Sequence, residues 1–489
     1  MNKHNQRSVQ STTSRQNNKR PNVLMIQSDE HSPFLSSIEG HKHIQTPNLQ
    51  KLADRGCYFQ SHYTVSPLCC PARSSWFTGQ RPHKSQVYNN SIVFPKALPT
   101  IGGILNKQGI YTVHIGKVDG HMKAEDMGYS EMHRLWSPSV QDPGDMNISR
   151  SPVPVRSLVS IDGVARNEMY GPVENPFKQD EPAFKLTANW LATKAIELDQ
   201  PWFVSLNTSK PHFPCFTSEE LWNKYESCQD LPEFDASHPN ALHPVTRSLR
   251  DHFQVDQYDE KALRGIRRGY VANVDWLDSK IGELVAVLEE TGQLDNTVII
   301  YTSDHGAMMG EFGLQWKCSM HETSARVPLI ITGPGFEQGV INHTATDSMD
   351  LQATIFKIFN AERPDEWDGE PIQSLTINDN NRASMSEFHG HGTHSSSYLI
   401  RRGDWKYVYH FGEPAQLFNI ANDPRESIDA VQTAIENPQV VDDLHSVLLG
   451  YLDPDKEYHR AEAFINKQLE EFKTGGFEML SGGHALRTQ

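Results

Sequence analysis

Four short apolar segments, each closed by polar residues, constrain the fold of this chain more than any other feature. They are NVLMI (22–26), IYTVHI (110–115), WFVSLN (202–207) and TVIIYT (297–302). A continuous apolar run of this length is typical of a strand that is buried on both faces. Such strands occur in parallel sheets whose two faces are covered by helices. The sequence therefore predicts an α/β fold with a large, mixed, mostly parallel sheet flanked by helices.

Helical patterns lie between these segments. From Tyr270 to Gly292, apolar residues recur every three or four positions, which predicts an amphipathic helix that ends at Gly292. A shorter helix is expected with Thr46 as its N-cap, Pro47 in its first position and Gly56 as its stop. The alternation of strands and helices supports the prediction of a parallel sheet.

The pattern changes near residue 375. The segment SYLIRRGDWKYVYHFGEPAQLFNI (397–420) reads as short strands joined by glycine and proline turns. It predicts a small C-terminal α+β subdomain with an antiparallel sheet. A further helix is expected around residues 456–472.

Charge and composition exclude several classes of protein. The formal net charge of −16 argues against a nucleic-acid partner, because nucleic-acid-binding surfaces are basic. No apolar run approaches the ~20 residues needed to cross a bilayer, and residues 1–20 lack the apolar stretch of a secretory signal. The six cysteines show no metal-type spacing and no dense disulfide framework. We therefore expect a reduced, cytoplasmic protein without a membrane partner; a transit-like peptide is the alternative.

Acidic and histidine residues follow two of the predicted strands, in SDEH (28–31) and TSDHG (302–306). Because parallel strands end at one edge of a sheet, these groups can converge on a hard divalent cation. For any single aspartate, a role in a cap or a turn is more common. Basic residues follow the strands at the same predicted edge, and they are Lys117, Lys210, His212 and Lys317.

Two adjacent cysteines, Cys69 and Cys70, precede Pro71 and Arg73 in the stretch SPLCCPARSSWFTG. A helix beginning near Pro71 would place both thiols at its N-terminus, where free N–H groups attract anions and lower the thiol pKa. Arg73 could then bind an anion held by these N–H groups. On spacing alone, a buried thiol pair under a loop is an equally good interpretation.

Taken together, these motifs resemble the type I, formylglycine-dependent sulfatases of the alkaline-phosphatase-like superfamily. CCPARSSWFTG matches their signature Cys-x-Pro-x-Arg followed by Thr-Gly. Further blocks recur in order: the strand before Asp29, IGK (115–117), KPHFPCF (210–216) and NTVIIYTSDHGAMMGEFGLQWK (296–317). The resemblance implies an alkaline-phosphatase-like sandwich. The blocks span most of residues 21–375, the expected catalytic domain. The polar, basic residues 1–20 are expected to form a disordered tail, and residues 376–489 the C-terminal subdomain.

The same resemblance implies roles for the residues of a candidate site. Cys69 is the position that is converted to formylglycine, against a divalent cation that is most often Ca²⁺, with Mg²⁺ or Mn²⁺ as alternatives. The implied metal ligands are Asp29, Glu30, the modified Cys69, Asp304 and His305. The implied contacts of the formylglycine, the sulfate and the leaving-group oxygen are Arg73, Lys117, His212 and Lys317.

One position departs from many sulfatases. Family members often carry histidine two residues after the lysine that aligns with Lys117, where it helps to expel sulfate. Here that residue is Asp119, and His121 follows two residues later. The sequence leaves open which of the two, Asp119 or His121, acts as the base.

The resemblance implies hydrolysis of a sulfate monoester, with a sulfated carbohydrate as the expected substrate. The alternatives are a choline-sulfatase-like enzyme, a phosphonate monoester or phosphodiester hydrolase, and a non-catalytic sulfate-ester binder. The expected partners are a small-molecule or oligosaccharide ester, a formylglycine-generating maturation enzyme, and a second copy of the chain.

Two C-terminal segments carry further hypotheses. The apolar residues Phe477, Met479 and Leu480 suggest contacts in a homo-oligomer. The segment EFHGHGTH holds three histidines that either recognise substrate or lie in a solvated loop. These are His389, His391 and His394.

Overall fold

The computed structural model describes residues 20–90, 98–119, 127–133, 135, 168–253, 255, 258–474, 477–480 and 484–487. Residues 1–19 of the expected tail and the candidate base His121 lie outside this described part. Among the described helices, none combines the length and apolar character that crossing a membrane requires.

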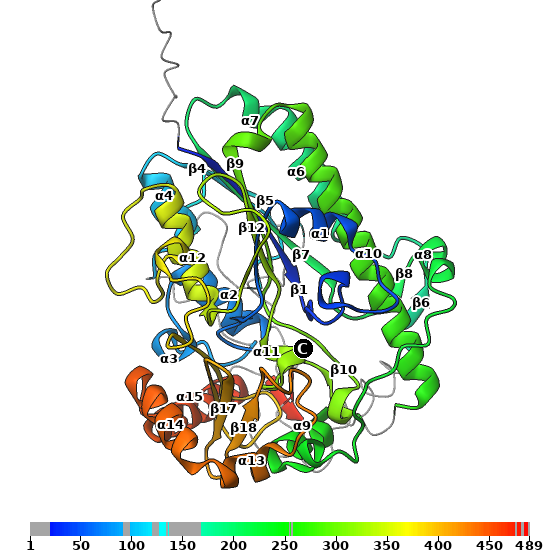
Figure 1. The fold of residues 1–489 in the computed structure, drawn as a ribbon, viewed down its shortest axis with the longest axis vertical. Coiled ribbons are helices and arrows are strands. Elements are labelled where there is room, and N and C mark those ends of the chain that lie inside the picture. The colour runs from blue at the N-terminus through cyan, green and yellow to red at the C-terminus, as the bar shows by residue number, and fades with distance from the viewer. Residues whose placement is uncertain are drawn as a thin grey trace, which may run out of the picture.

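An eight-stranded mixed sheet forms the centre of the molecule (Figure 1). Its strand order is β13–β2–β12–β9–β1–β7–β4–β5. The bounds are β13 (Val340–Asn342), β2 (Gly56–Phe59), β12 (Leu329–Thr332), β9 (Thr297–Ser303), β1 (Asn22–Asp29), β7 (Trp202–Pro211), β4 (Tyr111–Gly116) and β5 (Glu131–His133). The four predicted strands are β1, β4, β7 and β9, which pair in parallel, whereas β12 is antiparallel to β9 and β2. The predicted mostly parallel sheet is confirmed.

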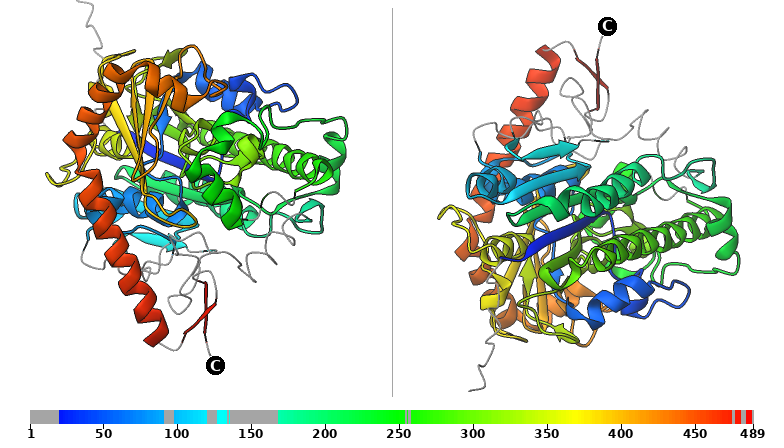
Figure 2. Two further views of the ribbon diagram at one scale, coloured as in Figure 1. Left: turned by 90° about the horizontal axis from the view of Figure 1, so that it is seen from below. Right: turned by 90° about the horizontal axis from the view of Figure 1, so that it is seen from above.

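The residues of β1 show why both faces of this sheet are covered. Val23 and Met25 pack on one face, and Leu24 and Ile26 pack on the other, since successive side chains of a strand point to opposite sides. The first face is covered by α2 (Cys69–Thr78), α4 (Ile101–Lys107) and α12 (Ser348–Ile358), and the second by α1 (Pro47–Asp54), α6 (Glu181–Ala192) and α10 (Glu260–Glu290). Figure 2 shows helices on both sides of the sheet.

The ends of α1 differ from the sequence prediction. The helix starts at Pro47 as expected, but the Thr46 hydroxyl accepts a hydrogen bond from the Ser37 N–H (3.1 Å) and not from α1. Asp278 of α10 supplies the cap, because its carboxylate accepts from the Leu49 N–H (2.8 Å). The glycine expected to stop α1 is the first residue of β2. Tertiary contacts have thus replaced both local signals.

The helix predicted from Tyr270 is longer than expected. α10 begins at Glu260, where the Asp259 side chain caps it by accepting from the Ala262 N–H (2.7 Å). Gly292, the expected stop, follows α10 with a φ of 68°, a conformation that glycine adopts without steric cost.

A four-stranded antiparallel sheet, in the order β15–β16–β17–β18, forms the core of the C-terminal subdomain and confirms the predicted antiparallel sheet. Its strands are β15 (Ala383–Phe388), β16 (Ser397–Arg402), β17 (Trp405–His410) and β18 (Gln416–Asn419). α14 (Pro438–Tyr451) packs on it; α13 (Ala430–Glu436) precedes α14, and α15 (Pro454–Thr474) matches the helix expected near 456–472. A hairpin of β19 (Phe477–Leu480) and β20 (His484–Arg487) follows and projects from the body in Figure 2. The expected contacts of Phe477, Met479 and Leu480 in a homo-oligomer stay a prediction.

Short elements complete the described fold. The remaining strands are β3 (His62–Tyr63), β14 (Thr346–Asp347), β6 (Tyr170–Pro172), β8 (Cys215–Thr217), β10 (Met308–Met309) and β11 (Gln315–Trp316). The remaining α-helices are α3 (Pro82–Ser85), α7 (Lys194–Glu197), α8 (Glu219–Lys224), α9 (Pro244–Phe253) and α11 (Glu322–Ala325). The C-terminal ends of β1, β4, β7 and β9 share one edge of the sheet, as expected of parallel neighbours.

Candidate active site

The side chains that follow β1 and β9 form a buried acidic cluster. The two strands are parallel neighbours in register, so Asp29 and Asp304 reach the sheet edge side by side. Asp29, Cys69, Asp304 and His305 each offer one potential ligand atom, and these four atoms lie within 4.8 Å of one another. All four residues are buried. Carboxylates and an imidazole at this spacing can share one metal ion.

The ring of His305 is oriented toward this cluster. Its Nδ1 lies 2.9 Å from the Gly306 carbonyl oxygen, which can only accept, so Nδ1 carries the proton. Nε2 is then the atom with a lone pair, and it lies 3.1 Å from Cys69 Sγ and 3.7 Å from a carboxylate oxygen of Asp29. A backbone carbonyl that fixes the tautomer in this way is typical of metal-binding histidines.

Glu30 stands beside the cluster. Its backbone N–H donates to Asp304 Oδ1 (3.2 Å), and its Oε2 is 3.1 Å from both Lys317 Nζ and His212 Nε2. Its Oε1 is buried and has no hydrogen-bond partner within the described residues. Burial raises the pKa of Glu30 to about 7. A buried carboxylate oxygen without a donor fits a position for a cation.

Cys69 is the first residue of α2, two positions before the predicted start of the helix. Cys69 and Cys70 are both free and buried. Burial, reinforced by Asp29, raises the pKa of the Cys69 thiol well above its usual range. The expectation of a lowered thiol pKa was therefore wrong: desolvation and a neighbouring carboxylate outweigh the N–H groups at the helix end.

Arg73 lies in the first turns of α2 and is fully buried. Its guanidinium donates to Asp304 Oδ2 (2.8 Å) through Nε and to Asp29 Oδ2 (3.2 Å) through Nη2. Its Nη1 donates to Asn207 Oδ1 (3.1 Å) within β7. The sequence analysis did not identify Asn207 as a site residue, although its place at the end of the predicted strand 202–207 could have indicated it.

Lys117 follows β4 and also enters the cluster. Its ammonium contacts Asp29 Oδ2 and lies 2.8 Å from Asp119 Oδ2. Although burial disfavours a charged lysine, Asp119 and Asp29 raise the pKa of Lys117 well above its usual range. Lys117 is therefore a cation that joins Asp119 to the acidic cluster. His121, the other candidate base, lies outside the described residues.

His212 and Lys317 form a direct pair. Lys317 Nζ donates to His212 Nε2 (2.6 Å), while His212 Nδ1 donates to the Phe213 carbonyl oxygen (2.6 Å). Burial and the positive charge of Lys317 hold the pKa of His212 well below its usual range. His212 is accordingly the neutral acceptor of the pair, and Lys317 is the charged donor.

Lys210 lies near the end of β7 and does not reach the cluster. Its Nζ donates to the carbonyl oxygens of Pro214 (3.0 Å) and Phe216 (3.2 Å). Lys210 thereby holds the loop that carries His212. From the sequence alone, a lysine near the end of a strand could not be assigned either to the acidic cluster or to the support of a loop.

The histidines of EFHGHGTH are more buried than a solvated loop would allow. His389 and His391 are 1% and 5% exposed. His389 Nε2 lies 2.8 Å from Glu387 Oε2, and His394 Nε2 lies 2.7 Å from Glu413 Oε1. The interpretation as a solvated loop was therefore wrong for His389 and His391, because the loop packs between the C-terminal sheet and the catalytic domain. His389 contacts Tyr88 and Tyr398, and His391 contacts Phe253 of α9.

Comparisons with known proteins agree with this geometry. The sequence profile of the sulfatase family matches residues 21–361, well over half of the chain. The protein belongs to the sulfatase family. A second profile, N-sulphoglucosamine sulphohydrolase, C-terminal, matches residues 310–452 of this sulfatase.

Curated relatives support the same conclusion. The sulfatase is 32% identical to the choline-sulfatase of Rhizobium meliloti (strain 1021), over 91% of this chain and 88% of that protein. It is 27% identical to human arylsulfatase K, over 88% of this chain and 82% of that protein. The protein is thus a sulfuric ester hydrolase.

Solved structures confirm the fold. A structure solved in complex with its substrate D-glucosamine-2-N,6-O-disulfate superposes with a TM-score of 0.68 at 20% identity, covering 90% of this chain and 99% of that chain. The phosphonate monoester hydrolase of Agrobacterium radiobacter superposes with a TM-score of 0.69 at 20% identity, covering 96% and 100%. The sulfatase therefore has the alkaline-phosphatase-like fold that the sequence predicted.

Proposed function

We propose that this sulfatase hydrolyses a sulfated carbohydrate, using a formylglycine made from Cys69 and one divalent cation, Ca²⁺. The proposal rests chiefly on the surroundings of Cys69, whose Sγ is 3.1 Å from His305 Nε2 and 4.0 Å from Asp29 Oδ1. In the mature enzyme, Sγ would be replaced by the oxygens of a hydrated aldehyde. That group supplies two oxygens on one carbon, one to take up the sulfuryl group and one to expel it.

The residues that would hold the cation are Asp29, Glu30, Asp304 and His305. Three carboxylates and one imidazole suit a hard divalent ion such as Ca²⁺, with Mg²⁺ or Mn²⁺ as alternatives. The unpartnered Oε1 of Glu30 supports this assignment. When bound, the ion supplies positive charge where negative charge develops during sulfuryl transfer.

The basic residues of the chain would act on the sulfate group. A sulfate monoester is an anion, so its approach to an anionic oxygen has to be screened by cations. Arg73 is already oriented by Asp304 and Asn207, which reduces its reorganisation when sulfate binds. Lys117 would hold the sulfate from the side of β4. Burial opposes the charge of both groups, but nearby carboxylates raise the pKa of each. These are Asp304, Asp29 and Asp119 at Arg73, and Asp119 and Asp29 at Lys117.

Lys317 and His212 would act on the leaving-group oxygen. Lys317 carries the donating N–H groups, and His212 accepts one of them at 2.6 Å. His212 thereby orients Lys317 while remaining neutral. Sulfate is expelled when a base removes the proton from the second hydroxyl of the formylglycine hydrate. Asp119 and His121 remain the two candidate bases, and Asp119 is held 2.8 Å from Lys117.

Conversion of Cys69 would require a formylglycine-generating partner. The residues Cys69, Pro71 and Arg73 supply its recognition pattern. Cys69 is only 4% exposed in the folded chain. We therefore expect the modification to precede folding of this region.

The choice of a carbohydrate substrate is supported by the match of residues 310–452 to the N-sulphoglucosamine sulphohydrolase profile. A choline-sulfatase-like activity is the second candidate, since the chain is 32% identical to a choline-sulfatase. A screen of sulfated mono- and oligosaccharides against choline sulfate tests the two. A kcat/KM for choline sulfate that exceeds every carbohydrate value would refute the carbohydrate proposal.

A hydrolase of phosphorus esters and a non-catalytic binder would each behave differently from this sulfatase. A phosphonate monoester or phosphodiester hydrolase on the same fold would turn over an aryl phosphodiester faster than an aryl sulfate, and we expect the reverse. A non-catalytic binder would carry an ordinary thiol at Cys69 in its native host. We expect the mass of the tryptic peptide that contains Cys69 to show the aldehyde or its hydrate.

A further inference from the structure

Glu30 adopts a backbone conformation that residues with a side chain rarely adopt. Its φ is 63°, in the left-handed region, and such strain persists only where surrounding contacts hold the backbone in place. A carboxylate oxygen of Glu30 lies within 4.8 Å of potential ligand atoms of Asp29 and His212. The contacts that hold the backbone of Glu30 therefore also determine where one proposed ligand of the cation lies.

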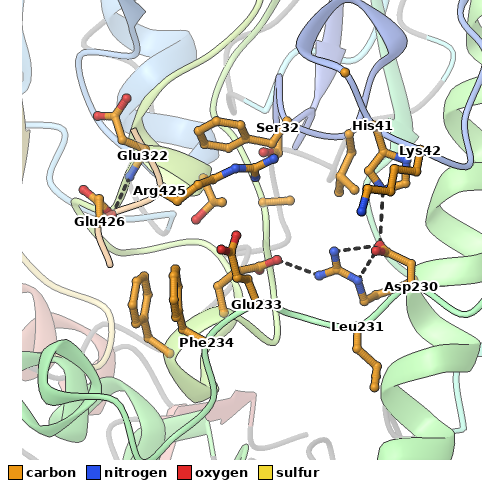
Figure 3. A pocket seen from close by; sticks show the side chains of 18 of the residues that line it. Ser32, His41, Lys42, Asp230, Leu231, Glu233, Phe234, Glu322, Arg425 and Glu426 are labelled. Carbon is orange, nitrogen blue, oxygen red and sulfur yellow. Dashed lines mark hydrogen bonds and ion pairs between the residues drawn. The ribbon is translucent and has the colours of Figure 1, made fainter. Parts of the chain in front are cut away.

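Packing alone does not hold the loop after β1. Ser32, Phe34 and Leu35 of this loop line a cavity of about 370 Å³, and Figure 3 shows Ser32 in its wall. Residues in the wall of a cavity lack packed protein neighbours on that side, and so they lose the dispersion contacts that such neighbours supply. The backbone of this loop therefore depends on hydrogen bonds from other elements.

One side chain, Tyr270 of α10, bonds to the backbone on both sides of His31. Its hydroxyl donates to the Glu30 carbonyl oxygen and accepts from the Ser32 N–H (3.1 Å). Tyr270 is fully buried, and burial raises the pKa of Tyr270 well above its usual range. The hydroxyl therefore keeps its proton and remains a donor. A single hydroxyl group thus closes the turn at Glu30.

The other contacts of this turn come from β9 and the residue after it. The His31 N–H donates to the Ser303 hydroxyl (3.0 Å), and His31 Nδ1 lies 2.5 Å from the Tyr301 hydroxyl. The Glu30 N–H donates to Asp304. These contacts hold His31 and the N–H of Glu30, whereas Tyr270 holds the carbonyl group of Glu30.

The packing of α10 fixes the position of Tyr270. The helix comes so close to β8 that a Cβ at Gly269 would lie 2.1 Å from the Cys215 carbonyl oxygen, which only glycine allows. Tyr270 belongs to a buried apolar cluster that includes Leu35 and Ala307. The core around α10 therefore fixes Tyr270, and Tyr270 in turn fixes the turn at Glu30.

We propose that Tyr270 is a positioning residue of the cation site, which holds Glu30 in the conformation that presents its carboxylate to the ion. The inference rests on the proposed cation and adds a residue outside the set of ligands. A ligand that is already held in place loses less conformational freedom when the ion binds. Replacement of a residue that supports a metal ligand typically weakens metal affinity by about 10- to 100-fold.

The test is a calorimetric titration of the full chain with Ca²⁺, after chelation and below the Tm of each metal-free variant. Tyr270→Phe deletes the hydroxyl and keeps the ring, so we expect the Kd for Ca²⁺ to rise by about 10- to 100-fold. The matched control is Tyr398→Phe, since Tyr398 is also fully buried and its hydroxyl donates to the Pro454 carbonyl oxygen (3.2 Å) in the C-terminal subdomain. The Kd of this control should stay within about twofold, because distant substitutions act independently. An equal rise of Kd in both variants would overturn the proposal.

A double-mutant cycle tests whether Tyr270 acts through Glu30. Glu30→Gln removes one carboxylate and leaves Asp29, Asp304 and His305 as ligands, so its weaker affinity remains measurable. In this background, Tyr270→Phe should raise the Kd by no more than about threefold, since residues that act through one contact have non-additive effects. The same factor in both backgrounds would overturn the proposal in favour of a general disturbance of the loop.

The chain without substitutions separates this inference from the proposed function. If it binds Ca²⁺ and Tyr270→Phe has the same Kd as Tyr398→Phe, only the role of Tyr270 is overturned. If it binds none of Ca²⁺, Mg²⁺ and Mn²⁺, the assignment of the cation is overturned together with this inference.

Discussion

Asp119 Oδ2 lies 2.8 Å from Lys117 Nζ, and the same ammonium contacts Asp29 of the acidic cluster. A carboxylate that can accept a proton is thus linked through one lysine to a candidate metal ligand. We expect Asp119→Asn to lower kcat by about 10²–10⁴, the usual contribution of a general base, with little change in KM. Steady-state kinetics with an aryl sulfate measure both parameters.

The control for this variant is Asp453→Asn, which replaces an exposed carboxylate that forms an ion pair with Lys456. It should leave kcat and KM unchanged. His121→Ala is measured beside it. Normal turnover by Asp119→Asn, together with a stalled His121→Ala variant, would assign the base to His121.

Cys69 and Cys70 are chemically identical neighbours with different surroundings. Cys69 Sγ faces His305 at 3.1 Å, whereas Cys70 Sγ lies 3.6 Å from the Asn90 carbonyl oxygen. We expect Cys69→Ser to abolish multiple turnover, because a serine offers one oxygen and cannot expel the bound sulfuryl group. Cys70→Ser should keep activity within a few-fold. Turnover counted per active enzyme distinguishes the two, and sustained turnover by Cys69→Ser would contradict the mechanism.

Removal of the divalent ion should affect both activity and stability. Without it, the buried carboxylates of Asp29, Glu30 and Asp304 repel one another. We expect chelation to abolish aryl sulfate hydrolysis and to lower Tm, and added Ca²⁺ to restore both. Ligand binding to the folded state stabilises it by ~2.7 kcal/mol at a hundred times Kd. Full activity at a metal content shown to be negligible would refute the assignment of the cation.

Stability should depend on pH through Glu387, which is buried between His83 and His389 at 2.8 Å from each. Burial alone would raise the pKa of Glu387, but the two imidazoles hold it well below its usual range. Its stabilising contribution is therefore complete above the unfolded pKa of about 4.3 and is lost as the pH falls below it.

The contribution of His83 to stability depends on pH in the opposite direction. Burial opposes its charge, but Glu387 raises the pKa of His83, so its contribution is present below about pH 6.5 and is lost at higher pH. We expect Tm to be greatest between these limits and Glu387→Gln to flatten the profile. Glu413→Gln, which removes the partner of the more exposed His394, is the control. Parallel Tm profiles for Glu387→Gln and the unmodified chain would refute this account.

Much of the fold was predictable from local patterns. The central strands were recognisable because a strand buried on both faces needs an uninterrupted apolar run, as in β1 from Val23 to Ile26. Helix α2 was not recognisable by periodicity, since all ten of its residues are buried and it has no exposed face. It was located only through the motif around Cys69.

Which side chains follow the parallel strands, and therefore which groups can meet at one edge of the sheet, could be inferred from local sequence patterns. Which of these groups face one another depends on how distant segments pack. Lys210 and His212 are two residues apart, yet one bonds to backbone carbonyls and the other to Lys317. Arg73 and Asp304, 231 positions apart, are hydrogen-bonded. Burial and charge depend on distant segments packed together, which local patterns do not encode, and this is why the pKa of Cys69 was predicted with the wrong sign.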